Sequence, residues 1–338
     1  MPPQVPPALR DLDFEAAALR IQGTVKRTPL VQLASQLHPA LAGHPKAQAR
    51  LAATEVYFKL ECLQETGSFK SRGAWNQVSQ LTEDERARGV VTTSSGNHGR
   101  ALSWAAGRAE VPATICMPAD AYPNKIQACR DLGATVRLGD TRPETDAICA
   151  ELAQAGAVLV HPYDAVRTIE GAGTVGLEIA EDLPCVDLVL CPVGGGGLIS
   201  GVALALRSKF GDQVRIVGAE PKGAATLSRG LEAGAPIDIP DIQTKVQGLC
   251  PLNVGALNID AAQAAVDQVV ELEDEHIFAA QALLVNHAGL VVEPAGAATL
   301  AAFLFTDLVD HLDFQNIALI VSGGNPAPEQ LQAIRNQS

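Results

Sequence analysis

The stretch VDLVLCPVGGGGLISGVALALRS, residues 186–208, carries the clearest structural signal in the chain. Its first eight residues are almost all apolar, which is typical of a strand covered on both faces of a sheet. Four glycines follow, and after them comes an apolar segment with the character of a helix. A buried strand, a glycine-rich turn and a helix in this order predict an α/β fold.

The same alternation of strand and helix patterns extends over most of the chain. It predicts an open, twisted, mostly parallel sheet with helices on both faces. We expect residues 37–54 to be a surface excursion and residues 229–244 to be a loop. The expected strands are residues 55–62, 89–93, 112–118, 134–139, 157–164, 186–193, 213–221 and 316–321.

Composition limits the class of protein. The 338 residues are 47% hydrophobic and 19% charged, as in a compact globular protein long enough for two domains. A net charge of −13 argues against nucleic-acid partners and anionic membranes. No apolar run is long enough to span a membrane, and the first residues lack the features of a signal peptide. Seven scattered cysteines without a Cys-x-x-Cys pair indicate free thiols in a reducing cytoplasm.

The glycine turn predicts a phosphate site. Consecutive glycines before a helix expose backbone N–H groups, and the helix N-terminus adds partial positive charge. The pattern matches neither a Walker loop nor a dinucleotide fingerprint. A tight turn alone needs only one glycine, so four favour phosphate binding. The glycines are Gly194, Gly195, Gly196 and Gly197.

Two other segments place polar side chains at the ends of predicted strands. In TTSSGNHGRA, residues 92–101, hydroxyl, amide and imidazole groups cluster where open α/β sheets bind ligands, and these groups could hold a carboxylate. An N-capping turn would need only one of them. In LIVSGGNP, residues 319–326, Ser322 ends an apolar strand, and on its own it is typical of a turn.

Lys70 lies in QETGSFKSRGA, residues 64–74, between a predicted strand and a predicted helix. A lysine at such a turn can point into a crevice. Together with the phosphate site and the carboxylate-binding loop, it suggests a phosphorylated aldehyde cofactor bound as a Schiff base.

Four ordered motifs, GSFKSRGA, SSGNHG, PVGGGGLISG and VSGGN, resemble those of the pyridoxal-phosphate enzymes of fold type II. The resemblance extends from about Thr28 to Pro326, and the pattern is most similar to the serine/threonine dehydratase and serine racemase branch. It implies two domains, each with an open, mostly parallel sheet, and the cofactor in the cleft between them. Residues 1–85 and 160–338 would form the large cofactor-binding domain, and residues 86–159 a small substrate-gripping domain. It also implies a homodimer.

The resemblance implies a role for each matching residue. Lys70 would hold pyridoxal 5′-phosphate, with Phe69 packed beside its ring and Asn97 beside its phenolic oxygen. The four glycines and Leu198 would hold the phosphate, and Ser322 would face the pyridine nitrogen. Glu293 heads a segment that borders the site in this family. The substrate would contact Ser94, Ser95, Gly96, Asn97, His98, Arg142, Tyr163 and Gly248.

The expected reaction is α,β-elimination from L-threonine or L-serine, giving a 2-oxo acid and ammonia. Tyr163 resembles the dehydratases, whereas Ser95 and Arg142 match racemase residues. A serine or aspartate racemase, or a dehydratase for 3-hydroxyaspartate or another 3-hydroxy amino acid, therefore stays open. Unusual segments at 170–174 and 247–255 leave the substrate undetermined. A catalytically silent amino-acid sensor and a β-replacement synthase are further alternatives.

The segment AEPKGAAT, residues 219–226, resembles a divalent-cation site of the same branch. Glu220 and the carbonyl of Ala224 could bind Mg²⁺ or Ca²⁺ together with water molecules. Thr226 stands where the family has an aspartate, which leaves this metal site open.

Overall fold

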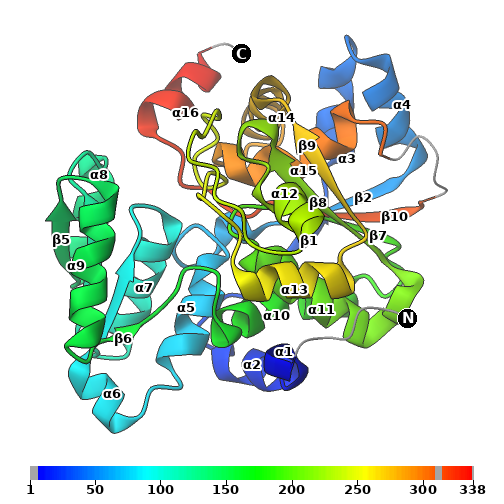
Figure 1. The fold of residues 1–338 in the computed structure, drawn as a ribbon. Coiled ribbons are helices and arrows are strands. Elements are labelled where there is room, and N and C mark those ends of the chain that lie inside the picture. The colour runs from blue at the N-terminus through cyan, green and yellow to red at the C-terminus, as the bar shows by residue number, and fades with distance from the viewer. Residues whose placement is uncertain (1–6, 309–313, 337–338) are drawn as a thin grey trace.

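Two sheets organise the chain in the computed structural model, which describes residues 7–308 and 314–336 (Figure 1). The six-stranded sheet has the order β1-β2-β10-β7-β8-β9, and only the β1–β2 pair is antiparallel. Its strands are β1 (Leu30–Gln32), β2 (Glu55–Lys59), β7 (Leu188–Pro192), β8 (Arg215–Pro221), β9 (Gln268–Leu272) and β10 (Asn316–Ile320).

Helices cover both faces of this sheet, because its central strands are apolar on both sides. In β7, Leu188 and Leu190 pack into one core, and Val189 and Cys191 pack into the other. The first face carries α3 (Ala34–Leu37), α4 (Pro45–Ala53), α14 (Asp274–Asn286) and α15 (Pro294–Phe305). The second face carries α2 (Phe14–Ile21), α10 (Val166–Asp182), α11 (Gly197–Phe210) and α13 (Ala256–Ala265).

The four-stranded sheet has the order β5-β4-β3-β6, and all its pairs are parallel. Its strands are β3 (Val90–Thr93), β4 (Ala113–Pro118), β5 (Thr135–Gly139) and β6 (Val158–Leu159). The helices α7 (Asn97–Arg108), α8 (Pro123–Asp131) and α9 (Arg142–Gln154) surround it on the left of Figure 1. Helix α5 (Lys70–Val78) packs against both α7 and α10, and so joins the two sheets.

Short helices complete the described chain. They are α1 (Pro7–Arg10), α6 (Glu83–Arg88), α12 (Thr226–Ala233) and α16 (Pro328–Arg335), with single 3₁₀ turns at His38–Leu41, Glu61–Leu63, Gly211–Gln213 and Lys222–Ala224. No helix in residues 7–308 or 314–336 is long and apolar enough to cross a bilayer.

The predicted fold class is confirmed, and the domain boundaries stay a prediction. Three local expectations are wrong. Residues 37–54 are mostly helical, because Leu37, Leu41 and Leu51 are buried in the core beside α15. Helix α12 occupies the start of the expected loop at 229–244. The strand expected at 157–164 is only β6.

Candidate active site

Lys70 begins helix α5 and points at the segment that follows β6. Its Nζ donates a hydrogen bond to the Pro162 carbonyl at 2.7 Å and lies 4.9 Å from the centre of the Phe69 ring. The Phe69 N–H donates to the carbonyl of Ser322 at 3.1 Å, which ties this turn to the end of β10. Burial lowers the pKa of Lys70 to about 8. A minor fraction of this amine is therefore neutral near physiological pH, far more than of a lysine with an ordinary pKa.

A buried ion network around Arg72, two residues after Lys70, holds α5 in place. The guanidinium of Arg72 is fully buried and contacts the carboxylates of Glu61 at 2.7 Å and Glu178 at 2.6 Å. Lys59, also fully buried, contacts Glu178 at 2.6 Å and donates to the Thr28 carbonyl at 2.7 Å. Burial alone would raise the pKa of Glu61, but Arg72 holds that pKa below its ordinary value. Buried ion pairs thus connect strand β2, the turn after it and helices α5 and α10.

The glycine turn lies between β7 and α11. In the described chain, no protein acceptor takes the backbone N–H groups of Gly194, Gly195, Gly196, Gly197 or Leu198. Gly196 has φ +91°, which a residue with a side chain rarely adopts. Free N–H groups at the N-terminus of a 14-residue helix suit a phosphate. The residues present therefore fit the phosphate group of the cofactor that the sequence analysis expects.

Close packing gives these glycines a second reason to lack side chains. A Cβ at Gly195 would overlap the ring of Tyr163, and one at Gly194 would lie 2.9 Å from the carbonyl of Gly248. Asn258, which the sequence analysis did not identify, is fully buried behind the turn, and its Nδ2 donates to the Gly195 carbonyl at 2.9 Å. The expectation that one glycine suffices for packing is therefore wrong.

Asn97 lies at the start of α7 and is held at both ends of its amide. Its Nδ2 donates to Glu293 Oε1 at 2.5 Å, and its Oδ1 accepts from Asn325 Nδ2 at 2.8 Å. Ser94 Oγ accepts the N–H groups of Gly96 at 3.3 Å and Gly99 at 3.2 Å. Gly96 is the N-cap residue of this helix, and Ser94 satisfies one N–H of its first turn from outside. The side chain of Ser95 makes no hydrogen bond within the described residues.

His98 is buried beside the Lys70 segment. Its Nε2 lies 3.0 Å from the Val160 carbonyl, and its Nδ1 has no partner in the described chain. Burial first, and then the charge of Lys70, lower the pKa of His98 to about 3. Because a carbonyl only accepts, the neutral ring must carry its proton on Nε2. His98 therefore presents an uncharged Nδ1 lone pair.

Most of the predicted cofactor residues lie along one closed circuit of contacts, in which each segment touches the next. It runs from Lys70 through Pro162 to Tyr163 and Gly195, and from Gly194 to Gly248. Gly248 lies beside Glu293, which bonds to Asn97 and also lies against Gly323. Gly323 follows Ser322, whose carbonyl returns the circuit to Phe69. Ser322 is buried, and its Oγ donates to the Ala295 carbonyl through a long bond of 3.4 Å. Segments far apart in sequence thus surround one small region.

Arg142 lies in the first turn of α9. It is exposed, and its charge acts on the phenol of Tyr163. Burial raises the pKa of Tyr163, and Arg142 opposes that shift. A guanidinium within electrostatic range of a phenol suits polar groups of a small substrate.

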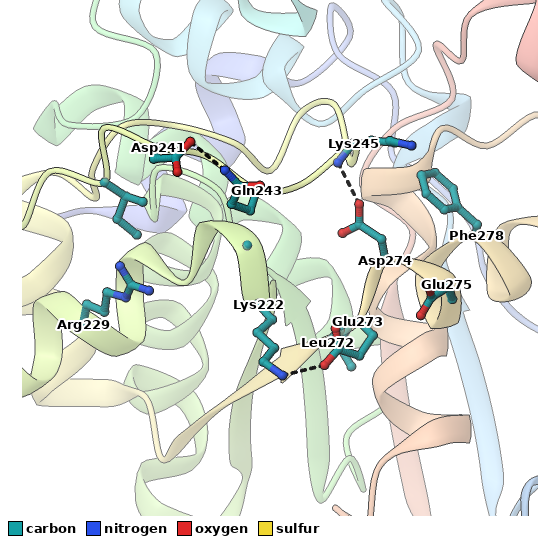
Figure 2. A pocket seen from close by; sticks show the side chains of 12 residues that line it. Lys222, Arg229, Asp241, Gln243, Lys245, Leu272, Glu273, Asp274, Glu275 and Phe278 are labelled. Carbon is teal, nitrogen blue, oxygen red and sulfur yellow. Dashed lines mark hydrogen bonds and ion pairs between the residues drawn. The ribbon is translucent and has the colours of Figure 1, made fainter.

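A cavity of about 720 Å³ lies elsewhere, at the C-terminal ends of β8 and β9 (Figure 2). Figure 2 shows one ion pair in it, Lys222 with Glu273 at 2.7 Å, and the carboxylate of Asp274 accepting the backbone N–H of Lys245 at 2.7 Å. None of the predicted site residues lines it. The candidate active site is therefore the region around Lys70.

The residues present do not fit the expected divalent cation. Both oxygens of Glu220 already accept backbone N–H groups, from Leu227 and Ser228, each at 2.9 Å. Burial raises the pKa of Glu220, which disfavours the charged form that a cation needs. Within residues 7–308 and 314–336, no group of three or more His, Cys, Asp or Glu side chains could hold a metal ion.

Comparison with known proteins identifies the family of the chain. Residues 21–323 match the family described as "Pyridoxal-phosphate dependent enzyme". The chain is 37% identical over 309 residues to an L-threonine ammonia-lyase of Thermotoga maritima, covering 90% of this chain and 76% of that protein. It is 38% identical over 319 residues to a serine racemase of Arabidopsis thaliana, covering 93% and 92%. The solved structure of maize serine racemase superposes with a TM-score of 0.86 at 34% identity, covering 96% of each chain.

Proposed function

The chain belongs to the fold-type II pyridoxal-phosphate-dependent enzymes, in the group of threonine dehydratases and serine racemases. We propose that it is an ammonia-lyase that acts on an L-β-hydroxy amino acid. L-Threonine and L-serine are the first candidate substrates. The supporting observation is the position of Lys70, whose amine has a pKa of about 8 and lies on the same circuit of contacts as the glycine turn.

When bound, pyridoxal 5′-phosphate supplies a carbonyl carbon that an amine can attack and a conjugated ring that withdraws electrons from the substrate's α-carbon. In this proposal the N–H groups of the glycine turn bind its phosphate. Ser322 would offer a neutral hydroxyl to the ring nitrogen, and the remaining N–H of Asn97 would serve the ring oxygen. These groups position the cofactor within reach of Lys70.

Lys70 is the proposed general base. Its neutral amine removes the α-proton, and the Pro162 carbonyl holds the Nζ in place by accepting one of its hydrogens. The N-terminus of α7 provides N–H groups for the substrate carboxylate. The reaction releases the β-hydroxyl as one water molecule and later consumes one water molecule, so there is no net change in water. The products are a 2-oxo acid and ammonium, and no oxidant is needed.

Racemisation is the second candidate, and Ser95 favours it. Its hydroxyl is free of protein partners in the described chain, so it could return a proton to the α-carbon. Elimination needs only the base on the Lys70 side, whereas racemisation also needs an acid on the opposite side. Arg142 supports a further candidate, a substrate with a second carboxylate such as 3-hydroxyaspartate. The homodimer and the cytoplasmic location stay predictions from the sequence.

The test is a panel of L-β-hydroxy amino acids offered to the cofactor-loaded protein, with 2-oxo acid and D-enantiomer measured in the same samples. We expect 2-oxo acid from L-threonine or L-serine at a higher rate than any D-product. Faster formation of the D-enantiomer would favour the racemase. Lys70→Ala should abolish both products, whereas Lys209→Ala, which removes a surface lysine paired with Glu15, should retain them.

A further inference from the structure

Glu293 is a buried carboxylate that the proposed mechanism does not use. It precedes helix α15 and is 7% exposed. Its backbone N–H donates to the Gly323 carbonyl at 3.1 Å, and a Cβ at Gly323 would overlap its Oε1. Glu293 is therefore held against the turn that carries Ser322, directly behind Asn97.

The amide of Asn97 has no freedom to turn while Glu293 is ionised. A carboxylate only accepts hydrogen bonds, so the Nδ2 of Asn97 must face it. Asn325 donates to the other end of the amide, and Asn325 is itself fixed by Arg100 Nη1 at 2.7 Å and by the Thr66 carbonyl at 2.9 Å. One N–H of Asn97 is left without a protein partner in the described chain.

We propose that Glu293 is a positioning residue, whose ionised carboxylate orients the Asn97 amide so that this remaining N–H faces the cofactor's ring oxygen. The inference rests on the proposed cofactor site and deepens it. A protonated Glu293 accepts from Asn97 only as a neutral group, so the hydrogen bond that holds Nδ2 weakens and Asn325 alone holds the other end of the amide firmly. Glu293 thereby makes cofactor affinity depend on pH.

The surroundings of Glu293 determine the pH range. Burial raises the pKa of Glu293 to about 7. The hydrogen bond from Asn97, the charge of Lys125 and the backbone of Asn325 lower this pKa, but by less than burial raises it. The other ionisable groups that face it are the thiol of Cys62, whose pKa is raised to about 12 by burial and nearby carboxylates, and Arg100, which acts through Asn325. The Cys62 thiol keeps its proton between pH 6 and 8, so Glu293 is the group that takes up a proton as pH falls through about 7.

The experiment measures the dissociation constant of pyridoxal 5′-phosphate from the cofactor-free protein, by fluorescence titration at several pH values from 6 to 8. The wild type is compared with Glu293→Gln at each pH, which cancels the titration of the cofactor phosphate and of Lys70. Above pH 7 the variant should bind about fivefold more weakly, the difference between a hydrogen bond to a charged group and one to a neutral group. Near pH 6 the two constants should converge.

A second pair of variants separates positioning from general damage. In an Asn97→Ala background, Glu293→Gln should change the dissociation constant by less than about twofold at every pH, because the amide that it orients is absent. A ratio of wild type to variant that is constant from pH 6 to 8, or an undiminished effect in the Asn97→Ala background, would overturn the proposal. If Glu293→Gln does not fold, wild type and Asn97→Ala alone should show dissociation constants that converge as pH falls below 7. The titration needs no substrate, so failure of the ammonia-lyase assay would not affect it.

Discussion

Replacing Arg72 by methionine should destabilise the protein strongly, because it leaves a carboxylate unpaired in the core. The guanidinium contacts Glu61 through Nε at 2.8 Å and Nη2 at 2.7 Å. Without it, Glu61 keeps only the Thr28 hydroxyl, whereas Glu178 keeps its ion pair with Lys59. One uncompensated buried carboxylate costs about 3–5 kcal/mol. The loss should therefore be close to this range and should come mainly from Glu61.

Urea denaturation of the cofactor-free protein measures this loss as a change in the free energy of unfolding. Arg27→Met is the matched control, since Arg27 also contacts two carboxylates, Glu181 and Asp182, but its side chain is 51% exposed. Its loss should stay below about 1 kcal/mol. Adding Glu61→Met to Arg72→Met should recover much of the stability, because the unpaired charge disappears. A double variant no more stable than Arg72→Met would refute the reasoning and assign the loss to packing.

Three further predictions concern the site itself. Ser95→Ala should keep the 2-oxo-acid yield from an L-substrate and lose any D-product in a chiral assay, and loss of both would mean that Ser95 holds the substrate or cofactor instead. Gly195→Ala should weaken cofactor binding in a fluorescence titration, because its Cβ overlaps the ring of Tyr163, and Gly195→Ala with Tyr163→Ala should bind more tightly than Gly195→Ala alone. Folding lowers the pKa of Lys70 from 10.5 to about 8, so the folded chain loses this proton at lower pH than the unfolded chain. The free energy of unfolding should therefore rise with pH between 8 and 10.5. An equally large rise in Lys70→Met would assign the effect to other groups.

Much of the fold was predictable because its signals are local. The apolar run before Gly194 and the turn before Lys70 are short patterns that report strand burial and a strand-to-helix junction. Residues 37–54 could not be assigned in this way, since their helices depend on a core shared with α15. Arg50 in α4, for example, donates to the carbonyl of Phe303, 253 positions away.

The site shows the same division between local and long-range information. Lys70, the glycine turn and Asn97 lie in recognisable motifs. The proximity of Lys70 to the glycine turn follows from the order of parallel strands, since β2 and β7 both pair with β10, whereas Asn97 follows β3 of the other sheet and comes close through the packing of α5 against α7. The residues that hold these groups in place cannot be predicted from motifs or strand order. Asn258 holds the glycine turn from a helix with no motif, and Asn325 reaches Asn97 across 228 positions. Such contacts depend on tertiary packing, which one sequence does not encode in any short pattern.

The central claim is that Lys70 binds the cofactor covalently through its amine, next to the glycine turn. The most direct test is to treat the cofactor-loaded protein with borohydride, digest it and locate the reduced cofactor by peptide mass spectrometry. We predict the label on the peptide that contains Lys70, and no stable label on the Lys70→Ala variant. A label on any other lysine, or a wild type that loads no cofactor, would contradict the account.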